Sequence, residues 1–519
     1  LMREDDRERA GINHGLASIS GVLKTAGHDV RLLHVCEKIW PIPEVESILA
    51  GVAGYEPGIV GISLLTMQVP WAEGVARAIR ARFPAIPIVA GGVHCTMVPE
   101  ETVASDAWDY VCLGEGEYAF LELVRRIEAG EDTTTCPNMW MRRGGEIVRN
   151  AVLPYPDLQA IPFTDYELFQ MDEILAAKNG WLSILTSRGC PYKCTYCFNY
   201  EIVERYVEDG AARSAKEFLR HYPVERVIDE IRELRRLHPG VKTVIFDDDL
   251  FTLNKRYVSE FCAKYRASGL DLPFVVNAHV ACFGDEMAKD LAGAGCRIVK
   301  FGLESGNPRI RRQVMLRHMT NDQIVESFEA AHKYDMHSSA FVMFGLPTET
   351  RAEVEDTLDL CARIKMGRFR WALFFPFPGT GGYRLARELD LIDPERFARM
   401  GNYFDGTCLR FDAAHSLWLD KLSRLCSLFV NARTDWACAP VYRRLVDEVE
   451  ALDRDGWEAR KKDLVAYDRE LSEDLMRQGL VHYTIRYAHV MGVRSDYIEN
   501  ERRREARTAQ EWNLAYTLD

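Results

Sequence analysis

Short apolar runs alternate with longer amphipathic segments along much of this 519-residue chain, and that alternation limits the folds available to it. In the N-terminal quarter, runs of strand length lie at 58–65, 86–92 and 110–117, with helix-like segments at 71–84 and 118–130. Strands that alternate with helices form a parallel sheet covered by helices on both faces. We therefore predict an α/β fold that begins with a doubly wound, Rossmann-like domain.

The same alternation returns in the middle of the chain and predicts a second parallel sheet. Six apolar runs of strand character lie at 181–189, 241–249, 274–280, 296–305, 338–347 and 370–380. Six βα units in series favour a partial (β/α)6 barrel, in which chemistry lies in the loops at the C-terminal ends of the strands. The residues after Asp393 are rich in Arg, Glu and Leu and are predicted to be helical through Asp519.

These patterns predict four parts of the chain. They are the doubly wound domain at 1–128, a hairpin and Pro-punctuated linker at 129–179, the barrel at 180–393, and a helical domain at 394–519 that caps the barrel. Several domains agree with the length, because a single core rarely grows beyond about 250–300 residues. The opening LMREDDRERAG contains no strand-like run, so we expect the first strand, and residues before Leu1, to be missing from this numbering.

Composition excludes several classes of protein. No run approaches the roughly 20 apolar residues of a membrane-spanning helix, and no signal-peptide pattern is present, which favours a cytoplasmic protein. The net charge of −13 argues against a protein that tracks nucleic-acid phosphates. The 14 cysteines are scattered apart from one cluster, which argues against a disulfide framework.

That cluster places Cys190, Cys194 and Cys197 in the pattern C-x-x-x-C-x-x-C, directly after a predicted strand. Tetrahedral zinc sites and most iron–sulfur clusters use four protein ligands, so the number three is informative. Three thiolates leave one iron of a cubane cluster open for chemistry. A zinc site with a distant fourth ligand, or incidental cysteines, are the alternatives that spacing alone leaves open.

In this context the cysteines resemble those of the radical S-adenosylmethionine (SAM) superfamily, whose signature is C-x-x-x-C-x-aromatic-C after the first barrel strand. Tyr196 stands at the aromatic position. The resemblance implies a [4Fe-4S] cluster held by the three cysteines, with the amino and carboxylate groups of SAM at the fourth iron. It also implies that an electron from the cluster cleaves SAM to a 5′-deoxyadenosyl radical.

Further resemblances follow the later strands, at 246–254 (FDDDLFTLN), 301–308 (FGLESGNP) and the ends of the fifth and sixth strands. The residues that these imply to bind SAM are Tyr196, Asp247, Asp248, Asp249, Glu304, Ser305, Phe344, Gly345 and Pro376. The register among the three aspartates stays open, with a solvated acidic turn as the alternative, and a structural ion pair is the alternative for Glu304. Asn277 departs from the family, whose members often carry Arg there.

The exit loops of the first domain resemble those of the cobalamin-binding domain found upstream of many radical SAM barrels. The residues implied to contact cobalamin are Ser63, Leu64, Leu65, Thr66, Gly91, Gly92, His94, Cys95, Gly114, Glu115, Gly116 and Glu117. A corrinoid needs a broad apolar crevice with backbone donors, which glycine-containing strand exits can provide. No histidine fits D-x-H-x-x-G, so we expect no such ligand to cobalt, and we expect His94 to shape its loop or to touch the corrin edge. A domain that binds something else, or nothing, is the alternative.

Together the resemblances imply a cobalamin-dependent radical SAM methyltransferase that acts on an unactivated carbon of a small molecule through the 5′-deoxyadenosyl radical and methylcobalamin. Its implied partners are the substrate and an external electron donor of the flavodoxin or ferredoxin type, with neither a membrane nor a nucleic acid. Cyclisation, rearrangement or oxidation without net methyl transfer is the alternative within the same architecture. A non-catalytic cobalamin or redox sensor is the alternative from a different class, and the acidic balance disfavours a methylthiotransferase that modifies tRNA.

Overall fold

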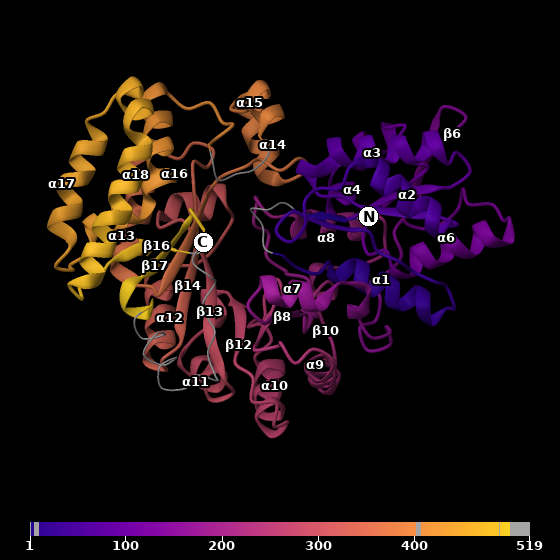
Figure 1. The fold of residues 1–519 in the computed structure, drawn as a ribbon, viewed down its shortest axis with the longest axis horizontal. Helices are drawn as coiled ribbons and strands as arrows, with labels where there is room; N and C mark the ends of the chain where they lie inside the picture. The colour runs from indigo at the N-terminus through magenta and orange to yellow at the C-terminus, as the bar shows by residue number, and fades with distance from the viewer. Residues whose placement is uncertain (1, 5–9, 401–405, 487, 499–519) are drawn as a thin grey trace. The chain divides into compact units, whose positions relative to one another are not determined.

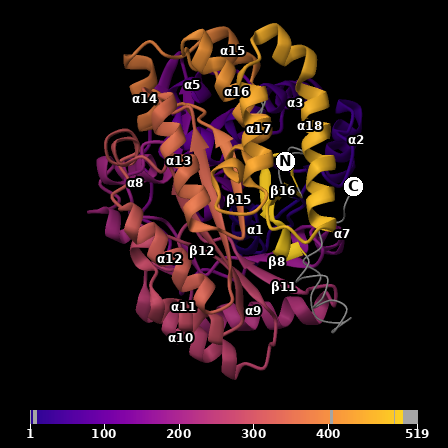
Figure 2. The ribbon, with the colours of Figure 1, turned by 90° about the vertical axis from the view of Figure 1, so that its left-hand side faces the viewer.

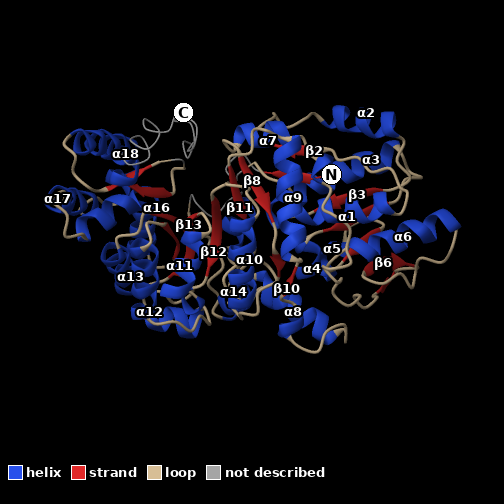
Figure 3. Ribbon diagram, turned by 90° about the horizontal axis from the view of Figure 1, so that it is seen from below, coloured by secondary structure: helices blue, strands red, loops and turns tan. Residues whose placement is uncertain are grey.

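The computed structural model describes residues 2–4, 10–400, 406–486 and 488–498. The chain forms two compact units, which we describe separately. The first unit comprises residues 1–193, 197–241 and 377–380, and the second comprises residues 194–196, 242–376 and 381–519. Strands and helices alternate along both units (Figures 1 and 3).

The first unit contains a sheet in which β3 (Val60–Ser63), β4 (Ile88–Gly91) and β5 (Tyr110–Cys112) run parallel. The antiparallel strands β6 (Met139–Arg143) and β7 (Glu146–Val148) extend this sheet beyond β5. Because the three parallel strands point the same way, the loops that leave them open at one edge of the sheet. This edge is where the sequence predicts a ligand.

Helices cover both faces of this sheet, as a doubly wound domain requires. Ile88 belongs to a core cluster that includes apolar residues of α3 (Val69–Arg82), whereas its neighbour Val89 packs with α6 (Glu117–Ala129). Successive residues of a strand face opposite layers, so these two clusters mark the two faces. The helix α1 (His14–Thr25) lies beside α6. The predicted Rossmann-like architecture is thereby confirmed.

The rest of the first unit is built of shorter elements. Its other helices are α2 (Val45–Tyr55), α4 (Val93–Met97), α5 (Pro99–Ala104), α7 (Met171–Ala177), α8 (Phe198–Glu208) and α9 (Val224–Leu237). The strand β8 (Trp181–Ile184) precedes the cysteine loop, and β9 (Ser187–Arg188) pairs antiparallel with β10 (Arg220–His221).

In the second unit, five parallel strands follow one another in chain order within the described residues (Figure 2). They are β11 (Thr243–Phe246), β12 (Phe274–Ala278), β13 (Cys296–Glu304), β14 (His337–Phe344) and β15 (Arg368–Leu373). The helices between them are α10 (Lys255–Ala267), α11 (Asp285–Gly293), α12 (Asn321–Lys333) and α13 (Arg351–Ile364). Together with β8, these strands correspond to the six runs that the sequence predicts.

The helices that follow are α14 (Gly381–Glu388), α15 (Pro394–Arg399), α16 (Ala413–Arg433), α17 (Ala439–Glu450) and α18 (Arg454–Arg477). In Figure 1, α16, α17 and α18 lie grouped together in orange and yellow. The indole of Trp371 in β15 donates a hydrogen bond of 2.9 Å to the carbonyl of Ser423, which fixes α16 against that strand. None of the helices that the structure describes is both long and apolar enough to cross a membrane.

The prediction of an all-helical C-terminal part is wrong at one place. The strand β17 (Met491–Arg494) pairs antiparallel with β15, and β16 (Tyr483–Ile485) pairs with β17. These strands are too short to show a periodic apolar pattern, and they form because β15 offers a free edge to a distant segment. The predicted helical residues 499–519 lie outside the described part of the chain.

The N-terminal expectation also needs correction. Residues Met2–Glu4 form the strand β1, which pairs parallel with β2 (His34–Cys36). The polar stretch that showed no strand-like run therefore contributes three residues of strand. The register pairs three residues of each strand, Met2 with His34, Arg3 with Val35 and Glu4 with Cys36.

Candidate active site

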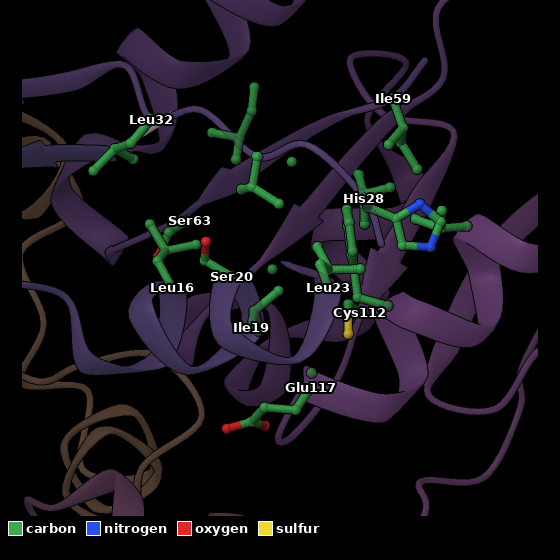
Figure 4. A pocket seen from close by; sticks show the side chains of 18 of the residues that line it. Leu16, Ile19, Ser20, Leu23, His28, Leu32, Ile59, Ser63, Cys112 and Glu117 are labelled. Atoms are coloured by element: carbon green, nitrogen blue, oxygen red, sulfur yellow. The ribbon is translucent and has the colours of Figure 1, made fainter. Parts of the chain in front are cut away.

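A cavity of about 630 Å³ lies in the first unit between the sheet and the helices α1 and α6. Leu16, Ile19 and Leu23 of α1 line it together with Cys112 of β5 (Figure 4). A mostly apolar hollow of this size, with a few polar groups at strand ends, is typical of a site for a large organic ligand. The strand-end location that the sequence predicts therefore coincides with a real cavity.

The cavity brings together many of the residues predicted to contact cobalamin. Those that line it are Ser63, Gly91, Gly92, Gly114, Glu115, Gly116 and Glu117. Those outside its lining are Leu64, Leu65, Thr66, His94 and Cys95. His94 is buried with Nδ1 3.3 Å from the hydroxyl of Thr66, and burial lowers the pKa of His94 to about 4. The imidazole is therefore neutral at pH 7 and braces its loop, and its contact with cobalamin stays a prediction.

Two of the glycines at this edge are required by close packing within the protein. Gly92 has φ +96°, and a Cβ there would lie 3.0 Å from backbone atoms of Leu64. Gly114 has φ +68°, and a Cβ there would lie 2.5 Å from the hydroxyl oxygen of Tyr206. That hydroxyl accepts a hydrogen bond of 2.8 Å from the amide of Glu115. Sequence reasoning missed Tyr206, which comes from α8 and carries no motif.

Two of the acidic residues that line the cavity, Glu115 and Glu117, form ion pairs with arginines. Nη1 of Arg188 lies 2.7 Å from a carboxylate oxygen of Glu115 and 2.6 Å from one of Glu117, and Arg220 also pairs with Glu115. Although Glu117 is buried, the ion pair with Arg188 keeps the pKa of its carboxyl below the usual value. Sequence reasoning missed both arginines, although Arg188 stands two residues before Cys190.

Of the three predicted cluster cysteines, Cys194 is buried and Cys190 and Cys197 are half-buried, and none of them forms a disulfide. No three His, Cys, Asp or Glu side chains among the described residues are already gathered into a metal site, so the fit rests on the donor set. Three thiols in one short loop match the ligands of a [4Fe-4S] cluster that keeps one open iron. By contrast, burial raises the pKa of Cys361 to about 12 and of Cys408 to about 11, which makes them poor thiolate ligands. The structure describes all fourteen cysteines and places none of them in a disulfide.

A buried cation stands beside one of these thiols. Nη1 of Arg317 donates a hydrogen bond of 3.7 Å to Sγ of Cys194 and one of 3.1 Å to the hydroxyl of Tyr196, while Nη2 donates to the carbonyl of Gly302 at 2.6 Å. Burial raises the pKa of Glu304, and Arg317 and Tyr196 oppose that rise. The guanidinium places a positive charge against a sulfur that the sequence predicts to bind iron. The predicted SAM residues Tyr196 and Glu304 thus share one network with Arg317, which sequence reasoning missed.

The acidic stretch after β11 divides into two kinds of position. Asp247 and Asp249 are exposed, whereas Asp248 between them is fully buried. The amide of Asn277 donates a hydrogen bond of 2.9 Å to the backbone carbonyl of Asp248. Asn277, the residue that departs from the family, therefore ties the end of β12 to this stretch.

Other predicted SAM residues at the strand ends are packed into the protein. Ser305 is fully buried, with its hydroxyl 3.3 Å from that of Thr357 and accepting a hydrogen bond of 3.2 Å from the amide of Asn307. Phe344 and Pro376 are buried as well. The hydroxyl of Ser305 thus serves the loop after β13, and the contact of these residues with SAM stays a prediction.

The loop after β14 is shaped by a buried carboxylate. Gly345 has φ +70°, and its amide donates a hydrogen bond of 2.7 Å to Glu349, as does the amide of Leu346 at 3.1 Å. Despite these donors, burial raises the pKa of Glu349 to about 8. Thr350 then begins α13 with a capping box to Glu353. The sequence pattern predicts Gly345 as a site residue, and the structure adds Glu349 beneath it.

Comparison with known proteins identifies two family domains in this chain. Residues 7–124 match the family model of the B12 binding domain, and residues 184–361 match that of the Radical SAM superfamily. An uncharacterized methyltransferase of Pyrococcus horikoshii is 29% identical over 368 residues, which cover 70% of this chain and 76% of that protein. The anaerobic magnesium-protoporphyrin IX monomethyl ester cyclase of Cereibacter sphaeroides is 24% identical over 399 residues, covering 74% of this chain and 61% of that protein.

A solved structure shares the fold. The radical S-adenosylmethionine methyltransferase TsrM from Kitasatospora setae, with cobalamin and a [4Fe-4S] cluster bound, aligns with a TM-score of 0.60 at 19% identity, over 75% of this chain and 74% of that chain. A B12-binding domain joined to a radical SAM domain defines a class of enzymes that combine both chemistries. This chain belongs to the cobalamin-dependent radical SAM enzymes, and its cofactors are a [4Fe-4S] cluster, SAM and cobalamin.

Proposed function

We propose that this enzyme is a C-methyltransferase that methylates an unactivated carbon of a small biosynthetic molecule. The observation that carries the proposal is one chain with both a three-thiol loop after β8 and a large, mostly apolar cavity in its B12-binding domain. Methylation of such a carbon needs a group that removes hydrogen and a group that carries methyl. Several similar proteins are named methyltransferases, which supports the same reading.

Each cofactor is assigned a set of residues in this proposal. The cluster ligands are Cys190, Cys194 and Cys197. The SAM site is formed by Tyr196, Asp247, Asp248, Asp249, Glu304, Ser305, Phe344, Gly345 and Pro376. The cobalamin site is formed by the cavity lining at Ser63, Gly91, Gly92, Gly114, Glu115, Gly116 and Glu117, together with Leu64, Leu65, Thr66, His94 and Cys95 of the same loops. When bound, the cluster and SAM supply one-electron chemistry that removes a hydrogen atom from the substrate, and cobalamin supplies a transferable methyl group.

The residues of the chain supply binding and electrostatics. Arg317 orients the sulfur of Cys194 through a charged hydrogen bond. The exposed carboxylates of Asp247 and Asp249 suit an ammonium group, such as that of SAM. The apolar side chains of α1 that line the first-unit cavity offer a surface for the apolar part of a large ligand.

The proposal also includes partners and a location. Each methylated product consumes two molecules of SAM and two electrons, so an external donor of the flavodoxin or ferredoxin type is required. We place the enzyme in the cytoplasm, with neither a membrane nor a nucleic acid as partner, and we propose that residues 394–519 cap the barrel of residues 180–393.

A second function is favoured by one specific observation. Similarity to the Cereibacter sphaeroides cyclase extends over 74% of this chain. Cyclisation or rearrangement without net methyl transfer would use the same cluster and the same cavity. The two functions differ in whether the product gains a carbon from SAM.

Anaerobic turnover of the reconstituted full-length enzyme separates them. The reaction contains reductant, hydroxocobalamin, methyl-deuterated SAM and a small-molecule extract of the source cells, and it is read by mass spectrometry. We expect one metabolite to gain the deuterated methyl group while 5′-deoxyadenosine and S-adenosylhomocysteine accumulate in equal amounts. An altered but unlabelled metabolite that appears with 5′-deoxyadenosine would reject methyl transfer and support cyclisation. The Cys194→Ala variant should form neither product.

A further inference from the structure

Arg188 links the cavity of the first unit to the loop of cluster cysteines. We infer that Arg188 is a positioning residue that couples occupancy of the cobalamin cavity to the conformation of the segment carrying Cys190. The inference rests on the proposed function, because it takes the cavity of the first unit to be the cobalamin site.

Arg188 belongs to a group of four mutually paired charges. Arg188 and Arg220 are register partners on the antiparallel strands β9 and β10. Both guanidinium groups pair with the loop after β5, Arg188 with Glu115 and Glu117 and Arg220 with Glu115. Two cations and two carboxylates cancel, which is the condition for holding charges away from water. The group is therefore a built feature of the fold rather than a solvated surface pair.

Arg188 joins three separate elements. Besides its two carboxylate partners, its Nε donates a hydrogen bond of 3.1 Å to the hydroxyl of Tyr222, and its Nη2 donates one of 3.0 Å to the hydroxyl of Ser18 in α1. The side chain of Arg188 is 13% exposed and that of Glu117 only 3%. A planar guanidinium reaches these partners at once, whereas a lysine ammonium has one nitrogen to share among them.

This network of charges lies at the cavity. Arg188, Glu115 and Glu117 all line it, and so do Leu16 and Ile19 of α1 (Figure 4). A ligand that fills the cavity therefore presses on both α1 and the loop after β5. Because Arg188 is bonded to each of them, filling the cavity favours one arrangement of its guanidinium over others.

The residue after Arg188 connects this arrangement to the cluster loop. Gly189 has φ +94°, and a Cβ there would lie 2.4 Å from the carbonyl oxygen of Phe218, so the chain is tightly packed directly after Arg188. Cys190 follows at once. A shift of Arg188 is therefore expected to move Cys190 as well, because the tightly packed backbone at Gly189 joins the two residues.

Hydrogen exchange of the full-length, cluster-free protein tests this coupling with hydroxocobalamin as the probe. In the wild type, we expect hydroxocobalamin to slow amide exchange several-fold in residues 186–193. The Arg188→Lys variant should still bind hydroxocobalamin, within about tenfold of the wild-type affinity, but should lose the slowing. Because coupling is reciprocal, cluster reconstitution should tighten hydroxocobalamin binding about fivefold or more in the wild type and leave it unchanged in Arg188→Lys.

Two further variants make the test decisive. Arg149→Lys changes an exposed arginine that pairs with Glu100 in the same unit, and it should behave as the wild type. Ser18→Ala removes one acceptor of Arg188 without changing charge, so it should weaken the slowing and decides the matter if Arg188→Lys does not fold. Full slowing of amide exchange in folded Arg188→Lys would overturn the inference. So would a wild type that binds hydroxocobalamin without any slowing of exchange. Failure of the wild type to bind hydroxocobalamin is a distinct result, which would overturn the proposed function and the coupling with it.

Discussion

The guanidinium of Arg317 donates a hydrogen bond to the sulfur of Cys194, with Nη1 3.7 Å from Sγ. Arg317 is 8% exposed, and its neighbours Tyr196, Glu304 and Cys194 together outweigh the effect of burial and raise the pKa of its guanidinium. A permanent positive charge thus stands against a sulfur that we assign to the cluster. Hydrogen bonds to the sulfurs and nearby charge are among the main determinants of an iron–sulfur reduction potential.

Replacing Arg317 by Gln should therefore make the cluster harder to reduce. The positive charge stabilises the more negative, reduced cluster, so its removal lowers the reduction potential, on the order of 60 mV, which is a tenfold change for one electron. A potentiometric titration followed by electron paramagnetic resonance measures this shift. Arg309→Lys serves as the control, because Arg309 pairs with Glu353 and not with a cluster cysteine. An unchanged potential in Arg317→Gln would remove the proposed role.

The three loop cysteines should differ from the other cysteines in iron binding. Alanine at Cys190, Cys194 or Cys197 should abolish the cluster and with it the formation of 5′-deoxyadenosine. Alanine at Cys361 should leave iron content unchanged, because that thiol is buried and its pKa is about 12. Iron and sulfide analysis after anaerobic reconstitution checks both statements. Full iron content in Cys194→Ala would contradict the assigned ligands.

Gly114→Ala should destabilise the first unit more than Gly130→Ala does. Both glycines have nearly the same positive φ, +68° and +67°, but a Cβ at Gly114 would clash with Tyr206, whereas nothing lies within 4 Å of one at Gly130. Backbone strain alone costs about 1–2 kcal/mol, and the clash adds to it only at Gly114. Thermal unfolding and hydroxocobalamin binding of both variants measure the difference. Equal losses in the two variants would show that the contact with Tyr206 is unimportant.

The stability of the second unit should fall as the pH rises through neutrality because of Glu349. Burial raises the pKa of this carboxyl from its ordinary 4.5 to about 8, so the folded protein retains a proton that the unfolded chain loses above about pH 4.5. The proton's contribution is complete below that pH and is lost as the pH approaches 8. Between pH 6 and pH 8 the loss amounts to about 2 kcal/mol.

Glu349→Gln removes the titrating group and should therefore be less sensitive to pH than the wild type over that range. Urea unfolding at several pH values measures the difference. The neighbouring Glu353 does not titrate in this range, because pairing with Arg309 lowers its pKa to about 2 and keeps it ionised throughout. Glu355→Gln, a change in the nearby helix α13, should retain the wild-type pH dependence. Parallel curves for wild type and Glu349→Gln would contradict the proposed protonation.

Much of the fold could be predicted because its signals are local. Buried parallel strands form near-continuous apolar runs, so β3 to β5 and β11 to β15 stand out in the sequence. The hairpin between β6 and β7 could be predicted from the adjacent glycines Gly144 and Gly145. Both adopt the positive φ that such a turn needs. By contrast, β1, β16 and β17 lie in segments without such runs and depend on partners elsewhere in the chain.

The sequence by itself determined the cofactor chemistry of this protein. Cys190, Cys194 and Cys197 lie within one loop, so their number and spacing are readable without a structure. Only the tertiary structure decided what surrounds them. Arg317 is 123 residues away from Cys194 and Arg188 is 71 residues away from Glu117, and neither arginine carries a spacing signal. Charge pairing acts through space, so the partners of a buried charge are set by how the chain packs and not by the order of its residues.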